Sequence, residues 1–414
     1  MEWSAALQRS AEGLVGLAGR RLERMEDVGG WEPRPRSGRR PALYVHIPFC
    51  LVPCDFCAFH RFAFREDTAR RYHLNLRREL ELLYDRGFAF SEAYLGGGTP
   101  TILPDELTRL MELLQDHQPD LPVSVETYPA DLGDELVRML ADHGVQRLSV
   151  GVQSFDPRLL RILGRDLIPP QEILRRLERT RGRLPTLQLD LLYNHPDQTP
   201  AVLRRDIAIA ADSGVDQVTF NPLMPPLVRG GEGGSPAAPD PRRADTLYGV
   251  IDEEMARRNW RSVTVWCFAP TGGGRAEYLV DNPEYLAAGC GAVGFYDGVF
   301  YHDTFSLRRY GELLEAGRLS AARLRRLRPW ERDAYLLLSF LFGTGGSADA
   351  LLNHLGGVLT RRIRTVGALW RLLGLNAERA WDLGPRGRRL INRMMQRFFG
   401  AQTAMRERAL SSGW

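Results

Sequence analysis

Short apolar runs alternate along the chain with longer stretches in which apolar residues recur every three or four positions. From residue 42 to 223 the apolar runs are ALYVHI, AYL, VSVET, RLSVGV, TLQLDLLY and QVTFNPL. The stretches with helical periodicity that follow them cover 67–85, 104–115, 134–142, 156–163 with 170–179, and 200–212. Strand-then-helix units repeated in this way form a parallel sheet. The pattern predicts an α/β fold, either a partial barrel or an open doubly wound sheet.

The segments on either side of these units read differently. Residues 1–27 have amphipathic helical spacing that GGWEPRP breaks, so 1–40 is predicted to be an N-terminal helix and linker. The core and its C-terminal extension are expected at 41–315. Residues 316–414 are predicted to form a small, basic C-terminal domain that is helical or winged-helix-like.

Within these parts, the segment MPPLVRGGEGGSPAAPDP is predicted to be a surface loop or linker because it is rich in Pro and Gly. A helix over 242–258, a strand at RSVTVWCF and a glycine-rich turn with a strand over 285–301 should follow. After residue 319 the pattern is helical, with one helix starting at 329–333 and another over 387–408. The apolar stripe of that last helix is predicted to be core: Met394, Met395, Phe398, Phe399 and Met405.

Polar and glycine residues collect where the predicted strands end. Three cysteines follow the first strand and GGGTP follows the second, while the later strands end at Glu126, Gln153, Asp190 and Asn221. Barrel enzymes assemble their sites at the carboxyl ends of consecutive parallel strands. The sequence therefore predicts one functional face.

The chain contains no lysine, so all 55 of its basic residues are arginine. Pyridoxal phosphate enzymes and Schiff-base aldolases need a lysine amine, and a phosphate-binding P-loop needs its lysine. These classes are excluded. The glycines at 230–234 are accordingly predicted to belong to a linker.

The charge is unevenly distributed. Residues 318–414 hold 18 arginines against 6 acidic residues, although the whole chain carries only +4. This segment either docks on an anionic surface, such as membrane headgroups or nucleic acid, or forms an arginine-rich solvated face. No apolar run approaches the roughly 20 residues that span a bilayer, and no secretory signal is visible. We expect a cytoplasmic protein, either free or peripheral at the inner membrane face, and no nucleic-acid partner.

Cys50, Cys54 and Cys57 stand at a C-x3-C-x2-C spacing. Three cysteines are odd for a disulfide framework and one short of a closed zinc site. Three thiolates can hold three irons of a 4Fe-4S cluster and leave the fourth iron open. The alternatives are a zinc site completed by His46 or His60, and ordinary buried cysteines.

Five motifs in order carry a family resemblance: LYVHIPFC-x3-C-x2-C, YLGGGTPT, VSVETYP, LSVGVQSF and LDLLYN. Over roughly residues 40–315 the chain resembles the radical S-adenosylmethionine (SAM) superfamily, in the branch of oxygen-independent coproporphyrinogen III oxidase. The resemblance implies a partial (β/α)6 barrel of the TIM type. It also implies a 4Fe-4S cluster, held by the three cysteines, that reduces SAM and releases a 5′-deoxyadenosyl radical.

The positions that match the family's SAM contacts can be carried over individually. Tyr44 matches the tyrosine beside the methionine part of SAM, and Gly96, Gly97, Gly98 and Thr99 match the backbone contacts to its amino group. Further polar contacts are implied for Glu126 and Arg165, and ribose contacts for Gln153 and Asp190. Glycine permits close backbone approach, and carboxylates or amides suit hydroxyl and ammonium groups.

Three other residues have candidate roles. His195 ends the fifth predicted strand on the functional face, where it is either an acid or base or part of a turn. Cys267 lies in an apolar strand and Cys290 lies among glycines, so both are expected to be buried, inert thiols.

Further motifs indicate which group of proteins within this branch the chain resembles. The oxidases carry a further cysteine after the third ligand, where this chain has Ala58 and Phe59. The related heme chaperone has an HN-x2-YW motif with no counterpart over 278–294. The stretches WCF, EYLVDNPEYLAAGCGAVGF and GRRLINRMMQRFF are similar to menaquinone C8-methyltransferases, which are class C radical SAM methyltransferases.

This resemblance implies methylation of an sp2 carbon of a planar aromatic substrate such as menaquinone, at C8, with two SAM molecules. The alternatives are an oxidative decarboxylase like coproporphyrinogen III oxidase in heme biosynthesis, or a heme chaperone. The partners implied are a small aromatic substrate, either a quinone or a tetrapyrrole, and an electron donor such as flavodoxin or ferredoxin.

Overall fold

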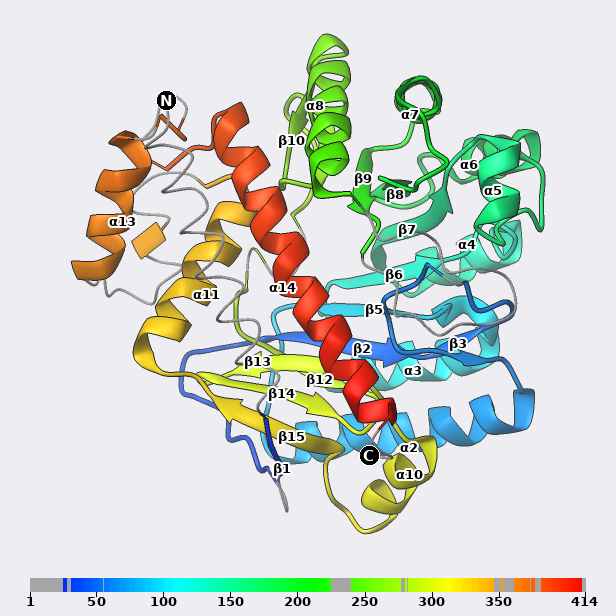
Figure 1. Ribbon diagram of the computed structural model, residues 1–414. Helices are drawn as coiled ribbons and strands as arrows, with labels where there is room; N and C mark the ends of the chain where they lie inside the picture. The colour runs from blue at the N-terminus through cyan, green and yellow to red at the C-terminus, as the bar shows by residue number, and fades with distance from the viewer. Residues whose placement is uncertain are drawn as a thin grey trace.

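Six parallel strands form the centre of the fold (Figure 1). They pair in chain order, so all six predicted strands are confirmed. The strands are β2 (Ala42–Ile47), β5 (Ala93–Gly97), β6 (Val123–Thr127), β7 (Val145–Gln153), β8 (Leu187–Tyr193) and β9 (Gln217–Pro222). The computed structural model describes residues 25–27, 31–54, 56–224, 240–276, 280, 282–345, 351–352, 361–372, 374–376 and 381–411.

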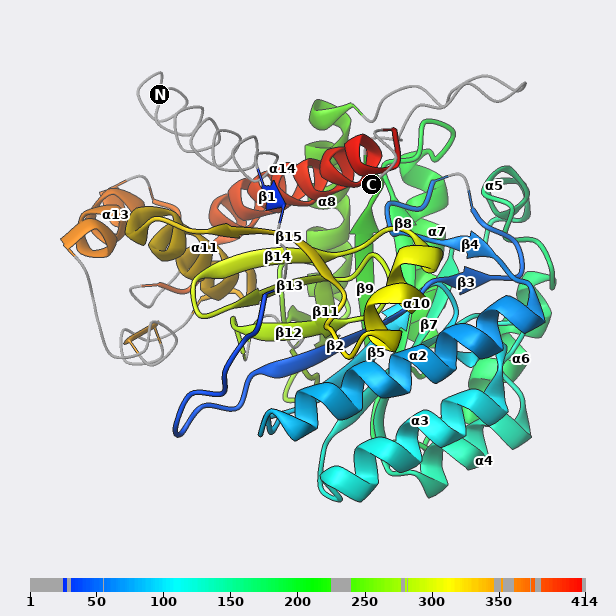
Figure 2. The same cartoon turned by 90° about the horizontal axis from the view of Figure 1, so that it is seen from below.

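The helices that follow these strands also agree with the predicted spans. They are α2 (Glu66–Asp85), α3 (Pro104–His117) with the short helix η1 (Pro100–Ile102), α4 (Asp134–Asp142), α5 (Pro157–Ile162), α6 (Pro170–Thr180) and α7 (Pro200–Asp212). Proline begins several of them, as the first helical position allows, and Asp156 and Thr199 cap α5 and α7. Figure 2 shows α2, α3 and α4 along one face of the sheet.

The sheet extends beyond both edges of the six parallel strands. On one side β11 (Cys267–Pro270) and β10 (Trp260–Ser262) add to β9. On the other side β2 is followed by β12 (Tyr285–Ala288), β13 (Val293–Tyr296), β14 (Val299–Asp303), β15 (Ala321–Arg326) and β1 (Glu26–Asp27). Because β2 pairs with β12 and β9 pairs with β11, the six parallel strands form a partial barrel that is open.

Four details of the predicted extension are wrong. RSVTVWCF is a hairpin, because the Thr264 hydroxyl accepts the N–H groups of Trp266 and Cys267 and turns the chain. Residues 285–301 contain three strands. Residues 321–326 form a strand on β14, and residues 26–27 pair with that strand in turn. Such short segments take their structure from the neighbouring sheet edge.

Further helices follow the sixth parallel strand in the chain. α8 (Pro241–Arg257) and α11 (Pro329–Phe342) confirm the predicted helices, and α14 (Pro385–Ser411) confirms and extends the last one. α10 (Leu307–Glu315) and α13 (Arg361–Leu372) are further helices. α14 packs on α8 and α11 and crosses in front of the sheet (Figure 1). None of the described helices is long and apolar enough to cross a bilayer.

Two predictions lie outside the described residues: the helix over residues 1–24 and most of the Pro- and Gly-rich loop, at 225–239. The division of the chain at residues 40 and 315 stays a prediction.

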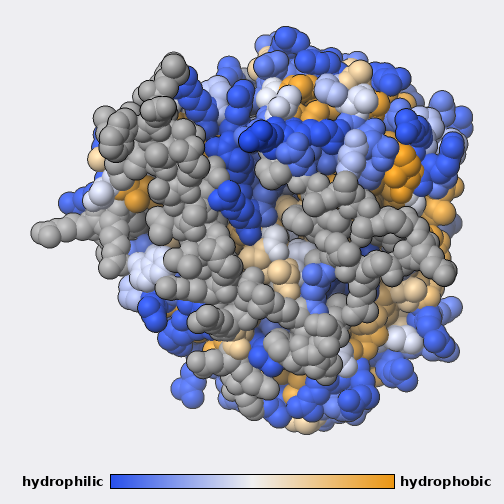
Figure 3. All heavy atoms as spheres, in the orientation of Figure 1, coloured by the Kyte–Doolittle hydropathy of each residue, from blue (hydrophilic) through white to orange (hydrophobic). Residues whose placement is uncertain are grey.

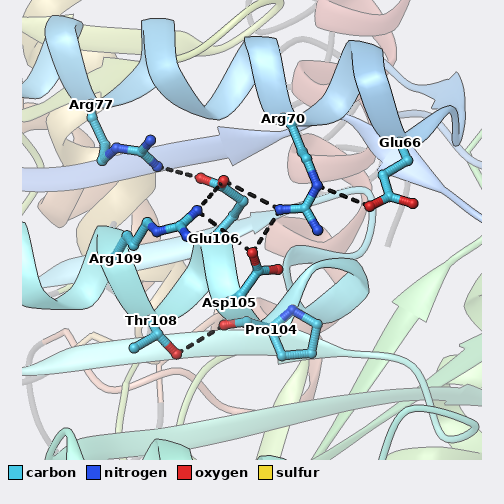
Figure 4. Close-up of polar contacts among 8 residues, drawn as sticks. All are labelled: Glu66, Arg70, Arg77, Pro104, Asp105, Glu106, Thr108 and Arg109. Atoms are coloured by element: carbon cyan, nitrogen blue, oxygen red, sulfur yellow. Dashed lines mark hydrogen bonds and ion pairs between the residues drawn. The ribbon is translucent and has the colours of Figure 1, made fainter.

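An arginine network joins α2 to α3 (Figure 4). Glu106 is only 4% exposed, and Arg70, Arg77 and Arg109 all contact its carboxylate. Arg70 also reaches Asp105 at 2.6 Å, so one guanidinium group joins two carboxylates. The flat guanidinium fork makes this bridging possible where a lysine would offer a single point charge. The network fixes the outer helices of the first two units.

Candidate active site

A cavity of about 340 Å³ opens at the carboxyl ends of the parallel strands. The predicted site residues that line it are Tyr44, Cys50, Cys54, Cys57, Gly97, Gly98, Thr99, Glu126, Gln153, Arg165, Asp190 and Asn221. The opposite wall comes mainly from α11 and α14, with Tyr335, Phe342, Met395, Phe398 and Phe399. The cavity thus has a polar floor at the strand ends and an aromatic roof. The strand ends that were predicted to share one face thus line one cavity.

The three cysteines lie on one loop that begins at the two-stranded ribbon of β3 (Phe49–Cys50) and β4 (Phe62–Ala63). Burial, together with the negative charge of a neighbouring Cys57 thiolate, raises the pKa of Cys50 to about 11. Among the described residues, no three His, Cys, Asp or Glu side chains converge on a single ion position. Each cysteine of a 4Fe-4S cluster binds a different iron, so the three thiols of such a site need not converge on one ion position.

The histidines that could complete a zinc site are engaged elsewhere. His46 Nε2 lies 2.8 Å from the carbonyl oxygen of His60, to which it must donate, and Nδ1 lies 2.8 Å from the Tyr44 hydroxyl. Burial lowers the pKa of His46 to about 4 and that of His60 to about 3. His60 Nε2 faces the Cys290 sulfur at 3.9 Å. Both rings are neutral packing elements beneath the cysteine loop.

Each glycine of the GGG turn is required by packing. A Cβ atom on Gly96 would lie 2.8 Å from the Tyr94 ring, and one on Gly98 would lie 2.6 Å from a backbone oxygen. Gly97 has φ +112°, and a Cβ there would lie 2.5 Å from the His46 ring. Gly96 is not among the residues that line the cavity. The turn brings the backbone of β5 against the cysteine loop.

The N–H groups of this turn are already used. Gly97 donates to Glu126 at 3.0 Å, Gly98 donates to the carbonyl of Ile47 at 2.8 Å, and Thr99 donates to that of Phe49 at 2.8 Å. What the turn can offer a ligand is therefore carbonyl oxygen, which accepts from an ammonium group.

Two side chains of opposite charge face the cavity. Glu126 accepts from the Tyr94 hydroxyl at 2.6 Å and from Gly97, which fixes the direction of its carboxylate. The guanidinium carbon of Arg165 lies 4.8 Å from the ring centre of Tyr128, and its Nε has no hydrogen-bond partner. A ligand that carries both an ammonium and a carboxylate group suits this pair.

Gln153 is the last residue of β7, and Asp190 lies in the middle of the neighbouring strand β8. Gln153 has φ 73°, a left-handed conformation that is uncommon for a residue with a side chain, at an irregularity in the pairing of β7 with β8. Asp190 accepts from Ser149 Oγ at 2.6 Å and from Gln188 Nε2 at 2.7 Å. Burial raises the pKa of Asp190, and these hydrogen bonds oppose that rise.

His195 does not line the cavity, and its acid or base role stays a prediction. Its Nδ1 accepts from the N–H of Asp197 at 3.2 Å, and its carbonyl accepts from Arg243 at 2.6 Å. These contacts hold the turn after β8. Cys267 and Cys290 are buried at 0% exposure, as predicted, and burial raises the pKa of Cys290.

Several cavity residues could not be found from sequence. Arg61 and Arg406 line the cavity beside the cysteine loop, and Arg406 comes from the last helix. Met395, Phe398 and Phe399 line the same cavity, and they also pack in or against the hydrophobic core, as their helical spacing predicted. A stripe of apolar residues has the same spacing whether it faces core or cavity.

Comparisons with known proteins identify the family. Residues 44–220 match the model of the radical SAM superfamily. The chain is 30% identical over 306 residues to heme chaperone HemW of Mycobacterium tuberculosis (strain CDC 1551 / Oshkosh), covering 70% of this chain and 78% of that one. It is 29% identical to anaerobilin synthase of Escherichia coli O157:H7, covering 68% and 67%. In fold it resembles coproporphyrinogen III oxidase (HemN) of Escherichia coli, with a TM-score of 0.70 and 20% identity over 87% of this chain and 90% of that one.

The cysteine loop, the open barrel and the sequence relatives therefore agree. Members of the matched superfamily use a 4Fe-4S cluster and SAM, and three thiols with a polar cavity beside them fit this pair of cofactors. The chain belongs to the radical SAM superfamily, in the branch that contains heme chaperone HemW and oxygen-independent coproporphyrinogen III oxidase.

Proposed function

We propose that this protein is a radical SAM enzyme that acts on a flat tetrapyrrole in the cavity between the strand ends and helix α14. The observation that carries the proposal is the meeting of a polar, cysteine-bearing floor with an aromatic roof in one cavity. The relatives are named for heme, a porphyrinogen and a bilin, which supports a tetrapyrrole as the substrate class.

In this proposal each floor residue has one task. Cys50, Cys54 and Cys57 would hold the cluster through three of its irons. The carbonyls of the GGG turn and Glu126 bind the ammonium group of SAM, while Arg165 binds its carboxylate. When bound, the cluster and SAM supply reductive cleavage of the sulfonium.

The remaining floor residues orient the nucleoside. Gln153 and Asp190 bind the ribose hydroxyls, and Tyr44 packs beside the methionine chain. Ser149 and Gln188 hold the Asp190 carboxylate in a fixed direction, which limits the orientations that the ribose can take.

The roof suits a large planar ring. Tyr335, Phe342, Phe398 and Phe399 come from two helices, and Trp266 and Phe305 complete the wall. Aromatic side chains bind flat rings by stacking and by edge contacts. The roof also excludes water from the reacting carbon, which protects a radical from quenching.

Methylation of an sp2 carbon of a smaller planar aromatic, such as menaquinone at C8, is the second candidate. The three stretches that resemble menaquinone methyltransferases all contribute to the cavity wall, through Trp266, Tyr285 and Phe398 among others. Their likeness therefore concerns residues that would touch a substrate. The absence of a further cysteine at Ala58 and Phe59 also separates this chain from the oxidases' pattern.

The two candidates differ in the SAM products. Anaerobically reconstituted, reduced protein would be incubated with SAM and, separately, with heme, coproporphyrinogen III and a menaquinone analogue. A tetrapyrrole substrate should increase 5′-deoxyadenosine and change in mass itself. A methylated quinone with matched S-adenosylhomocysteine would favour the second candidate. Heme bound without SAM turnover would contradict both and indicate a chaperone.

A further inference from the structure

Two arginines from distant parts of the chain bind the carbonyl groups of the cysteine loop. Arg61 Nη1 donates to the carbonyl of Cys57 at 2.9 Å, and its Nη2 donates to that of Cys54. Arg406, on α14, donates to the carbonyl of Ala58 at 2.5 Å and to that of Phe59. We call Arg61 and Arg406 the arginine clamp. It satisfies carbonyls on both sides of Cys57 in a loop with few backbone partners of its own.

Arg406 is held in place by the whole of α14. Nearer the start of that helix, Arg388 binds both carboxylate oxygens of Asp252 at 2.7 Å, and Arg393 reaches Asp245 at 2.5 Å. Asn392 Oδ1 accepts from the Tyr193 hydroxyl and from Trp266 Nε1. The helix is thus fixed to α8, β8 and the turn before β11. It carries Arg406 to the cysteine loop on a rigid support.

The clamp places positive charge on the cluster-binding loop. Arg406 is 9% exposed, and burial lowers its pKa to about 10, so it is charged at neutral pH. Both guanidinium groups donate to uncharged carbonyl oxygens, and in the described part of the chain the Nε atom of each has no hydrogen-bond partner. Coulomb interactions at such a partly buried site are several times stronger than in water.

A 4Fe-4S cluster with cysteine ligands becomes more negative by one charge when it is reduced, and nearby positive charge and hydrogen bonds favour the reduced form. We propose that the arginine clamp raises the reduction potential of the cluster and restrains its loop, so that α14 couples the substrate roof to electron uptake. Arg406 is a positioning residue in this scheme. The inference rests on the proposed role of the three cysteines as cluster ligands.

The test compares Arg406→Met with Arg397→Met after anaerobic reconstitution of the full chain. Both variants remove one charge from α14, but Arg397 is exposed. An EPR-monitored redox titration should show a lower midpoint potential for Arg406→Met than for the wild type. The expected shift is at least about 59 mV, which for one electron is a tenfold lower ratio of reduced to oxidised cluster at the same applied potential. Its iron should also transfer faster to a chelator. Arg397→Met should match the wild type in both measurements.

Unchanged potential and unchanged iron release in an iron-loaded Arg406→Met variant would overturn the proposal. If that variant does not retain iron, Arg406→Lys and Arg61→Met take its place. The lysine should keep the potential but release iron faster, because it keeps the charge and loses the fork. Arg61→Met should lower the potential, and a wild-type potential in that variant would overturn the proposal. A wild-type chain that assembles no cluster would instead refute the proposed function.

Discussion

Gln153 combines backbone strain with a place in the cavity floor. Its φ of 73° is costly for a side-chain-bearing residue, by about 1–3 kcal/mol. Gln153→Gly should remove this strain and, after the entropy cost of glycine is subtracted, raise the free energy of unfolding by about 1 kcal/mol. It should also weaken SAM binding, because the proposed ribose contact is lost. Denaturant titration and equilibrium dialysis with SAM would measure both effects.

The matched control is Asn259→Gly, an exposed residue with φ 58°. Asparagine tolerates this conformation, so the gain in stability should be smaller, and SAM binding should not change. Tighter SAM binding by Gln153→Gly than by the wild type would contradict the assigned ribose contact.

Gly97 tests the packing of the GGG turn against His46. Gly97→Ala would place a Cβ atom 2.5 Å from the His46 ring at φ +112°, so it should lower the free energy of unfolding by about 3 kcal/mol or more. Gly144 is the control, because it has φ +66° but a Cβ atom added there would have no atom within 4 Å. Gly144→Ala therefore measures the free-energy cost of the backbone conformation without a steric contact. Equal losses in the two variants, measured by denaturant unfolding, would show that the contact with His46 is not tight.

Among the cavity residues, those that belong to local sequence motifs could be predicted. Those that only the folded chain brings to the cavity could not. Cys50 follows the first predicted strand and Glu126 lies near the end of the third, and parallel strands bring such ends together. Arg406 lies 349 positions after Cys57 in the sequence, and no local pattern relates them. His195 shows the limit of the argument, because a residue just past a strand end can also turn into the protein.

Asp206 links two elements, α7 and the turn after β7. It is 1% exposed, and it accepts from Ser154 Oγ at 2.7 Å and from the Phe155 N–H at 2.8 Å. Burial raises its pKa from 3.8 to about 6. Its contribution to stability is therefore full below about pH 4 and is lost as the pH rises through 6.

Asp206→Asn should remove this pH dependence. Relative to the wild type, the variant should gain up to about 3 kcal/mol of unfolding free energy between pH 4 and pH 7. Denaturant unfolding at several pH values measures the difference, with Asp212→Asn at an exposed position of the same helix as the control. A difference that stays constant with pH would contradict the burial of a titrating carboxyl.

The long elements were predictable and the short ones were not. Strand-helix repetition determined β2 to β9 and their helices because both periodicities extend over whole elements. β15 is as long as β2 but reads AARLRR, with Leu324 as its one large apolar residue, so its sequence does not mark a strand and its pairing with β14 determines the structure. The hairpin at β10 and β11 depends on a single threonine hydroxyl.

The basic segment has a structural role at the scale of the whole molecule. Arg388 and Arg393 pair with aspartates of α8, and Arg406 binds the cysteine loop, so part of its charge is used inside the fold. Figure 3 shows mainly hydrophilic side chains on the described surface of this face, with smaller apolar areas among them.

Contact with an anionic membrane through residues 318–414 stays a prediction. Each arginine near such a surface contributes about 1 kcal/mol, and salt screens that attraction. Flotation with anionic vesicles should show binding at low salt that high salt removes, and no binding to neutral vesicles. Absence of binding at low salt would contradict membrane contact. The ion pairs inside the fold would then explain why residues 318–414 are rich in arginine.

The central claim is that Cys50, Cys54 and Cys57 hold a cluster that cleaves SAM in this cavity. The most direct measurement is 5′-deoxyadenosine formed from SAM by reconstituted, reduced protein, in the wild type, Cys54→Ala and Cys267→Ala. The account predicts product from the wild type and from Cys267→Ala, and none from Cys54→Ala. Equal product from all three, or none from an iron-loaded wild type, would contradict it.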